Sequence, residues 1–277
     1  MTHLDERYER VGREYDALDY ENVRLDTGSA IEYAITTRYL RRYVPDGATV
    51  VDVGVGVGHY SDGLARRGCE VHLVDVSQRL LDAAASRLEA AGLGDHILSA
   101  QRASATDLSH LSDACCDIVL LLGPLYHLLT GEERRSAIAE AARLLHTGGF
   151  VFAAGINTLT YLRDVIRNDP DDFGRRPAYF LDRLCRDGTL ETSGGQPGTM
   201  HTTTVSAFRA ELSPPFFEVV LAGVESFASK HEPEYHRASL DAKAALLDLI
   251  ERTGATPEGL GATSHYLFIG RRAEGER

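Results

Sequence analysis

The sequence predicts an α/β protein with a doubly wound, mostly parallel, seven-stranded sheet, helices on both faces and a small cap insertion. Short apolar runs alternate with segments of helical spacing between residues 49 and 156. A glycine-rich stretch, VVDVGVGVGHYSDGL, joins the first run to a helical segment. The chain has 277 residues, 43% of them hydrophobic, which is enough for one large domain with an insertion.

The N-terminal residues 1–28 are polar and rich in tyrosine, and we expect them to form a separate lid segment. A short helix is predicted near Glu6–Leu18, followed by a loop. Apolar residues at helical spacing predict the next helix over Ile31–Tyr43. Pro45, Asp46 and Gly47 then form a sequence that is typical of a turn.

Five apolar runs are predicted to form the parallel strands, at 49–53, 70–75, 97–101, 117–122 and 150–156. Helices are predicted between them at 59–67, 78–91 and 132–145. Ser77 is expected to cap the second of these helices, and Gly148-Gly149 to end the third. Ligands bind beyond the carboxyl ends of the strands in such sheets, so we expect the site there.

The regular alternation stops after residue 156, which predicts an inserted substrate cap over residues 157–203. Two short helices are expected there, at 161–168 and 178–187, followed by a loop or a twisted hairpin. Two closing strands are predicted at 217–226 and 264–271, with a helix at 240–253 between them. The predicted α/β domain therefore comprises residues 29–156 and 204–277.

The net charge of −12 argues against nucleic acid and anionic membranes as partners. The four cysteines include no CxxC pair, which argues against a structural zinc site or a disulfide framework. No apolar stretch reaches membrane-spanning length, so we expect a soluble, cytoplasmic protein. The sequence leaves a homodimer open. The stretch KHEPEYH contains two histidines and two glutamates, but its spacing and its proline favour a solvated loop, and no metal site is predicted.

The stretch from Val50 to Leu64 has the pattern of strand, glycine turn and helix, which lets a ligand approach bare backbone. A dinucleotide fingerprint requires G-x-G-x-x-G, and His59 stands where the third glycine would be. The pattern that remains, D-x-G-x-G-x-G, closely resembles the glycine loop of class I S-adenosylmethionine-dependent methyltransferases. The stretches CDIVLLLGPLYHLL and ARLLHTGGFVFAA are also similar to this family, so the resemblance covers roughly residues 45–156 and the last two strands.

In that family an acid closes the second strand and binds both ribose hydroxyls, and Asp75 stands at this position. The adenine-binding segment falls on Ser104-Ala105, where serine replaces the usual acid. The resemblance implies S-adenosyl-L-methionine as the cofactor and a Rossmann-like methyltransferase fold. It assigns cofactor contacts to Asp52, Gly54, Val55, Gly56, Gly58, Tyr60, Asp75, Val76, Ser104, Ala105 and Leu122, with Tyr15 and Arg24 from the lid.

Methyl transfer requires that the acceptor be aligned with the methyl group and, for a hydroxyl acceptor, that a proton be removed. His127 lies five residues past Leu122 and beside Tyr126, so His127 and Tyr126 are the candidate catalytic residues. His127 is equally well explained as an ordinary loop histidine, and His59 as an exposed one. The insertion also carries residues that could line an acceptor pocket or form local core: Tyr161, Phe173, Tyr179, Phe180 and His201.

The function that the resemblance implies is methyl transfer to O or N of a small-molecule acceptor, and secondary metabolism is one setting that we consider. Two other functions stay open at this point. The same fold could bind the cofactor for non-methylating chemistry, or it could serve as a non-catalytic partner subunit. An NAD-dependent oxidoreductase is nearly excluded by His59 in the third-glycine position.

Overall fold

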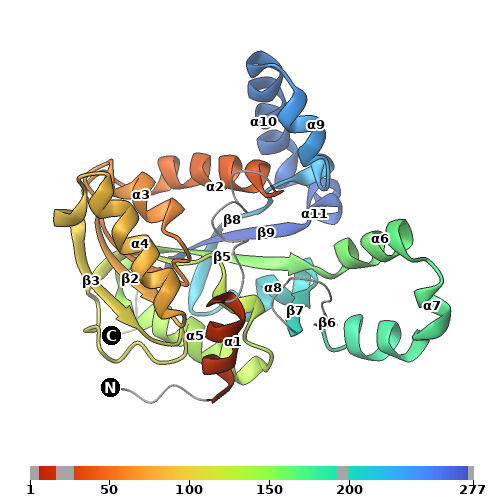
Figure 1. Ribbon diagram of the computed structural model, residues 1–277, viewed down its shortest axis with the longest axis horizontal. Helices are drawn as coiled ribbons and strands as arrows, with labels where there is room; N and C mark the ends of the chain where they lie inside the picture. Colours follow the sequence, from red (N-terminus) through yellow and green to blue (C-terminus); the bar gives the residue numbers. More distant parts are fainter. Residues whose placement is uncertain (1–5, 17–27, 192–198, 274–277) are drawn as a thin grey trace.

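The computed structural model describes residues 6–16, 28–191 and 199–273 of the chain. Its central feature is a twisted sheet whose parallel strands follow the order β3-β2-β1-β4-β5 (Figure 1). These strands are β3 (Ile97–Arg102), β2 (Glu70–Asp75), β1 (Thr49–Val53), β4 (Cys116–Leu121) and β5 (Leu145–Asn157). The antiparallel strands β9 (His265–Arg272) and β8 (Phe216–Gly223) complete the sheet beyond β5. The predicted fold class is therefore confirmed.

Helices cover both faces of the sheet. One face packs against α2 (Ala30–Tyr43), α3 (His59–Ala65), α4 (Gln78–Ala90) and α10 (Leu240–Gly254). The other face packs against α5 (Gly131–Leu144), α8 (Val205–Leu212) and α11 (Pro257–Ala262). The adjacent residues Val50 and Val51 are both fully buried, in opposite core layers, because side chains alternate along a strand. Ser77 caps α4 as predicted, by accepting a 3.1 Å hydrogen bond from the Leu80 N–H.

The end of α5 differs from the prediction. The helix stops at Leu144, and β5 begins at once at Leu145, so Gly148 and Gly149 lie inside the strand and do not end the helix. The register between β4 and β5 shifts between Cys116 and Ile118, where β5 carries these glycines. A Cβ atom on Gly149 would lie 2.6 Å from the Asp117 carbonyl oxygen, so only glycine fits this close approach of the two backbones.

The insertion adds two strands that the predicted count of seven omitted. Strands β6 (Thr189–Glu191) and β7 (Thr199–Thr203) pair antiparallel, in agreement with the hairpin interpretation. Ile156 pairs with His265 on one side and with Thr202 on the other. Strand β7 therefore lies on the β4 side of β5, just beyond the point where β4 ends, and the sheet has nine described strands.

The rest of the insertion is helical and projects from the end of β5 (Figure 1). It comprises α6 (Thr158–Asn168), α7 (Asp172–Arg175) and a π-helical segment, η5 (Tyr179–Leu184). These elements enclose a small core of their own, formed by Val165, Tyr179, Phe180, Leu184, Leu190 and Met200. Tyr126 packs against this insertion core from the main domain, so the core connects the insertion to the loop that follows β4.

The remaining elements are short. They are α1 (Glu6–Asp16), η3 (Gly94–His96), η4 (Pro124–Tyr126), η6 (Ser226–Ala228) and α9 (Glu232–Arg237). The prediction of a solvated loop for KHEPEYH is wrong, because α9 occupies most of it. Pro233 lies in the first turn of α9, where its missing N–H costs no helical hydrogen bond. None of the helices within the described residues combines the length and apolar character needed to cross a membrane.

Candidate functional site

A cavity lies at the carboxyl ends of β1, β2 and β4, where the sequence predicted the site. It encloses about 1030 Å³ of space free of protein atoms, counted to the solvent at its mouth. Its floor is the glycine loop after β1, and α1 covers part of it. The lining residues are Tyr8, Val11, Tyr15, Asp52, Val53, Gly54, Val55, Gly56, Val57, His59, Tyr60, Asp75, Val76, Leu80, Ala103, Ser104, Ala105, Leu122, Gly123, Pro124, Tyr126, His127 and Leu128.

The glycine loop depends on backbone conformations that other residues rarely adopt. Gly54, Gly56 and Gly58 have φ values of 74°, 57° and 81°. A Cβ atom on Gly54 would lie 2.8 Å from the Pro124 ring, so its absence lets the loops after β1 and β4 meet. Gly58 instead packs against Ala84 of α4 and lies outside the cavity lining. Gly58 thus allows the close packing of the loop against α4, and its predicted cofactor contact stays a prediction.

Asp75 holds the two loops of the cavity floor together. Its side chain is 6% exposed. Its Oδ2 accepts a 2.9 Å hydrogen bond from the Gly56 N–H, and its Oδ1 accepts one of 2.8 Å from the Ser77 N–H. A carboxylate oxygen can accept more than one hydrogen bond, so this fixed side chain can still receive hydroxyl donors from a ligand in the cavity.

Asp52 lies beneath the glycine loop and is almost fully buried. Burial is the main cause that raises the pKa of its carboxyl to about 6. The negative charge of Asp75 also raises this pKa, whereas the hydrogen bond from the Ser61 hydroxyl lowers it. The Ser61 hydroxyl donates to Asp52 Oδ2 at 2.6 Å. Asp52 also lines the cavity, so the predicted cofactor contact at this residue stays a prediction.

The loop after β3 forms the wall opposite α3. Ser104 is buried, and its hydroxyl is within 2.8 Å of the Thr106 hydroxyl. The Thr106 N–H also donates to Ser104 Oγ, at 3.2 Å. The serine hydroxyl is thus engaged locally, and Ala103 and Ala105 leave a small-residue wall beside it. Such a wall can accept a flat ring against the backbone.

Helix α1 covers the cavity through close contacts with the main domain. Gly12 allows the closest approach, since a Cβ atom there would lie 2.9 Å from the Val76 carbonyl oxygen. The Arg79 guanidinium donates to the Tyr15 carbonyl oxygen at 2.6 Å. The Tyr8 hydroxyl donates to Glu133 Oε1 at 3.1 Å. These contacts join α1 to β2, α4 and α5, all around the rim of the cavity.

The two candidate catalytic residues both line the cavity, at the loop after β4. The Tyr15 hydroxyl and His127 Nε2 are 2.6 Å apart, so His127 joins this loop to α1. The rings of Tyr126 and His127 are 4.8 Å apart in an edge contact. Tyr126 reaches the insertion core on its other side. The pair therefore lies between the cavity, α1 and the insertion.

The insertion residues lie mostly in local core. Tyr179 and Phe180 are buried there, and Tyr161 and Phe173 pack against them, as the core interpretation predicted. His201 lies apart, in a small cavity of about 200 Å³ that also includes Tyr126 and Arg134. Burial, with a smaller effect from the Arg134 charge, lowers the pKa of His201 to about 4. His201 is therefore neutral at physiological pH.

Most of the predicted cofactor residues meet in the one cavity. Those within the described residues are Asp52, Gly54, Val55, Gly56, Tyr60, Asp75, Val76, Ser104, Ala105, Leu122 and Tyr15. Arg24, and the lid residues 17–27 around it, lie outside the described residues. The expectation of an exposed His59 is wrong, because the first turn of α3 places it in the wall with 7% exposure.

The sequence reasoning missed several wall residues: Val11, Val53, Val57, Leu80, Ala103, Gly123, Pro124 and Leu128. Most of them directly adjoin a predicted residue or follow a strand end. Proximity to a strand end was the available signal. Leu80 has no such signal, because it reaches the cavity from the first turn of α4.

Residues 51–153 match the family model described as a methyltransferase domain. A ubiquinone biosynthesis O-methyltransferase of Azoarcus sp. strain BH72 is 31% identical over 159 residues, which cover 52% of this chain and 65% of that protein. The chain thus spans just under two thirds of the length of this relative.

Two solved structures share the fold. A SAM-dependent methyltransferase of Methanosarcina mazei matches with a TM-score of 0.60 at 16% identity, over 86% of this chain and 98% of that chain. The N-methyltransferase NodS of Bradyrhizobium japonicum, in complex with S-adenosyl-L-homocysteine, matches with a TM-score of 0.58 at 16% identity, over 98% of this chain and all of that chain (100%). At these identities the likeness is one of fold.

Residues 51–153 therefore form a methyltransferase domain, and the chain shares its fold with a SAM-dependent methyltransferase. The glycine loop, Asp75 and the stretch around the fourth strand predicted a methyltransferase, and this prediction is confirmed. What the similar proteins act on differs among them, and the acceptor of this chain is a separate question.

Proposed function

We propose that this protein transfers a methyl group from S-adenosyl-L-methionine to O or N of a small-molecule acceptor. The observation that carries the proposal is the cavity itself. It combines the positive-φ glycine loop, the fixed carboxylate of Asp75 and a cover formed by α1. No basic run of sequence accompanies it, and the net charge is −12, so a small acceptor is favoured over a nucleic acid.

The donor set of the cavity fits this cofactor. Asp75 offers two acceptor oxygens, which match the vicinal hydroxyls of a ribose. The Ser104-Ala105 wall suits the adenine ring, and Gly54 and Gly56 expose backbone to the amino-acid portion. Tyr60 and Tyr15 add aromatic surface at the rim.

When bound, S-adenosylmethionine supplies an electrophilic methyl group on a sulfonium, a good leaving group. The work left to the protein is alignment and proton removal. We assign acceptor orientation to His127 and Tyr126, because they line the cavity between α1 and the insertion. A hydrogen bond with the Tyr15 hydroxyl would hold the His127 ring in place while it orients an acceptor or accepts its proton.

The other two functions are less well supported. The lack of an open pocket would favour a non-catalytic subunit, whereas this chain has an open cavity at the strand ends. Non-methylating chemistry would use the same cavity, so the product distinguishes it. Release of S-adenosylhomocysteine with an acceptor from a panel of phenols and amines supports methyl transfer, whereas turnover of an acceptor without that release favours the non-methylating alternative.

The cofactor assignment is tested by the substitution Asp75→Ala. We expect the affinity for S-adenosylmethionine to fall about tenfold or more, because charge-assisted hydrogen bonds are lost. Isothermal titration calorimetry measures this change. Asp82→Ala, which removes an exposed carboxylate from α4, is the matched control and should leave the affinity unchanged. Equal affinity of wild type and Asp75→Ala, or tight binding of NAD, would contradict the assignment.

A further inference from the structure

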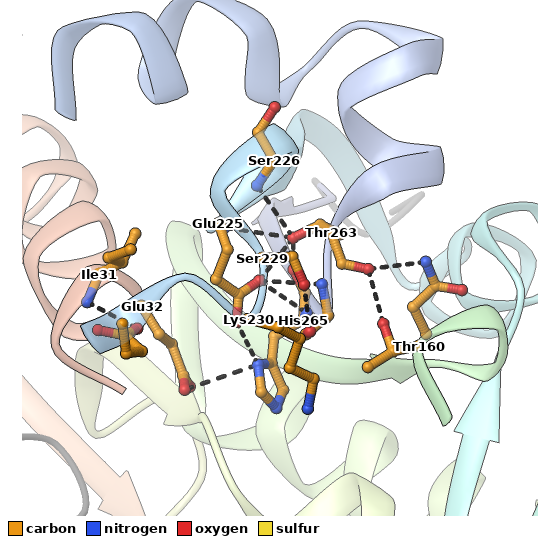
Figure 2. Close-up of polar contacts among 12 residues, drawn as sticks. Ile31, Glu32, Thr160, Glu225, Ser226, Ser229, Lys230, Thr263 and His265 are labelled. Carbon is orange, nitrogen blue, oxygen red and sulfur yellow. Dashed lines mark hydrogen bonds and ion pairs between the residues drawn. The ribbon is translucent and has the colours of Figure 1, made fainter. Parts of the chain in front are cut away.

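A second group of chemically active side chains also lies at the carboxyl ends of the parallel strands, outside the cofactor cavity. We call Glu32, Glu225 and His265 the Glu–His cluster. They come from α2, from the loop after β8 and from the start of β9 (Figure 2). None of the three lines the cofactor cavity.

The sheet register explains this location. His265 pairs with Ile156, which lies three residues beyond Ala153, the partner of the last β4 residue, Leu121. The cluster therefore lies on the carboxyl side of the strands, two strands away from β4. Helix α2 connects the two sites, because Tyr33, next to Glu32, has its ring 5.3 Å from that of Tyr60 in the cavity wall.

The three ligand atoms are close enough to share one ion. All of them lie within 4.8 Å of one another. Nδ1 of His265 is 3.7 Å from Glu32 Oε2 and 2.6 Å from Glu225 Oε1. Ligands about 2.1 Å from a metal ion are about 3–4 Å apart, so the first distance fits and the second must open by a few tenths of an ångström. A metal ion would replace the proton between His265 and Glu225.

Hydrogen bonds fix Glu225 in the orientation that such a site requires. Its Oε2 accepts from the Thr263 hydroxyl at 2.6 Å and from the N–H groups of Ser264 and His265 at 3.1 and 2.9 Å. Its Oε1 is thereby directed toward the His265 ring, as Figure 2 shows. Metal-binding carboxylates in proteins are commonly held by a second layer of hydrogen bonds of this kind.

The loop that carries Glu225 adopts a conformation that needs support. Ser226 has a φ of 48°, in the left-handed region that favours glycine. The N–H groups of Glu225 and Ser226 both donate to the Thr263 hydroxyl, at 3.2 and 3.3 Å. The network therefore maintains a strained turn in order to place this carboxylate, and such strain concentrates at functional sites.

A third carboxylate, on Glu232, supplies an independent observation. Oε1 of Glu232 accepts a 3.2 Å hydrogen bond from the N–H of Ile31, the neighbour of Glu32. Oε2 of Glu232 is buried and has no hydrogen-bond partner among the described residues. A buried acceptor without a donor is costly, and it calls for an unobserved partner such as an ion. Burial also raises the pKa of Glu232, and the charges of Glu225 and Glu32 raise it further.

We propose that Glu32, Glu225 and His265 bind one divalent transition-metal ion, and that Glu232 lies beside it as an additional carboxylate. One imidazole with several carboxylates suits Mn²⁺, Fe²⁺ or Zn²⁺ better than it suits Mg²⁺ or Ca²⁺, which prefer oxygen ligands alone. Glu32 and Glu225 are 6% and 5% exposed, whereas the His265 side chain is 25% exposed and provides an entry path.

The test uses the full-length protein, treated with a chelator and then titrated separately with Mn²⁺ and Zn²⁺ in a calorimeter. We expect one ion per chain. His265→Ala and Glu32→Gln should each weaken binding at least about tenfold. The control His146→Ala removes an exposed histidine at the far end of β5 and should bind like wild type. The absence of one-per-chain binding, or binding that is equal in all four proteins, would overturn the proposal and leave the cluster as a hydrogen-bonded ion pair.

A measurement on the wild-type protein covers the case in which a variant fails to fold. Zn²⁺ should shift the imidazole NMR signals of one histidine stoichiometrically, and unchanged signals would contradict the site. S-adenosylmethionine binding by the metal-free protein separates this proposal from the previous one. We expect that binding to be retained, since none of the three ligands lines the cofactor cavity.

Discussion

The floor of the cofactor cavity and the insertion core are built in different ways. The floor comes from loops that follow adjacent parallel strands, and a polar contact joins two successive loops through Gly56 and Asp75, which are 19 positions apart. The insertion core gathers six buried residues from several short elements between Val165 and Met200. Among the residues that the structure describes, Tyr126 both packs against this core and lines the cavity.

The floor of the cavity and the insertion therefore depend on different hydrophobic clusters. A floor made of strand ends is held by the whole sheet, so the cofactor side is part of the main core. The insertion has its own hydrophobic cluster, so its stability can change while the floor stays intact. If the insertion binds the acceptor, as the proposed function requires, acceptor specificity can change there while the cofactor side stays intact.

The largest expected effect is a loss of stability that is confined to the insertion. Leu184 is fully buried in the insertion core, and Leu184→Ala should cost the insertion about 2–5 kcal/mol through lost burial and a cavity. Hydrogen exchange should rise over residues 158–191 and 199–203, while the affinity for S-adenosylmethionine changes less than about twofold. Leu181→Ala, at a position 70% exposed in the same π-helical segment, is the control. A loss of cofactor affinity as large as that of Asp75→Ala would contradict the separation.

The second effect is the pH dependence of stability that Asp52, beneath the cavity floor, should produce. The pKa of Asp52 is raised to about 6, so between about pH 4 and pH 6 the folded protein binds more protons than the unfolded chain. Stability from this group is present at low pH and is lost as the pH rises through that window, by up to about 3 kcal/mol. Asp52→Asn carries no charge and should gain stability relative to wild type from pH 4 to pH 7.

Urea unfolding at pH 4.5, 5.5 and 7.0 measures this difference. The control Asp46→Asn removes a carboxylate whose side chain is 77% exposed, and its difference from wild type should stay nearly constant. If the Asp52→Asn difference is also constant with pH, the buried carboxylate does not titrate in this range.

The smallest effect concerns the cover of the cavity. Tyr15→Phe keeps the ring contact with His127 but removes the 2.6 Å hydrogen bond between the two side chains. A loss of about 1 kcal/mol should weaken S-adenosylmethionine binding about fivefold and speed its dissociation. Stopped-flow fluorescence measures the rate, with Tyr43→Phe, on α2 against Phe150, as the control. Unchanged dissociation would mean that α1 does not retain the cofactor.

Local patterns in the sequence determined the parallel sheet and most of the cofactor cavity. The sequence alone predicted that the glycine turn at Val50–Leu64 and Asp75 form one site. This was possible because parallel strands place their carboxyl ends together. The chemistry of the glycine loop is likewise local, since positive φ values restrict three positions to glycine. The class of the domain followed from these residues.

Only the tertiary structure decided which distant residues meet. Glu32, Glu225 and His265 are separated by up to 233 positions, and no spacing rule connects them. These residues meet because β9 runs antiparallel to β5 and because α2 packs against the same face of the sheet as β9 residues Leu267 and Ile269. The pairing of the insertion hairpin with the main sheet was hidden for the same reason, because β7 pairs with the end of β5 that extends beyond β4. Local propensity determines elements, whereas the pairing of strand edges determines which side chains become neighbours.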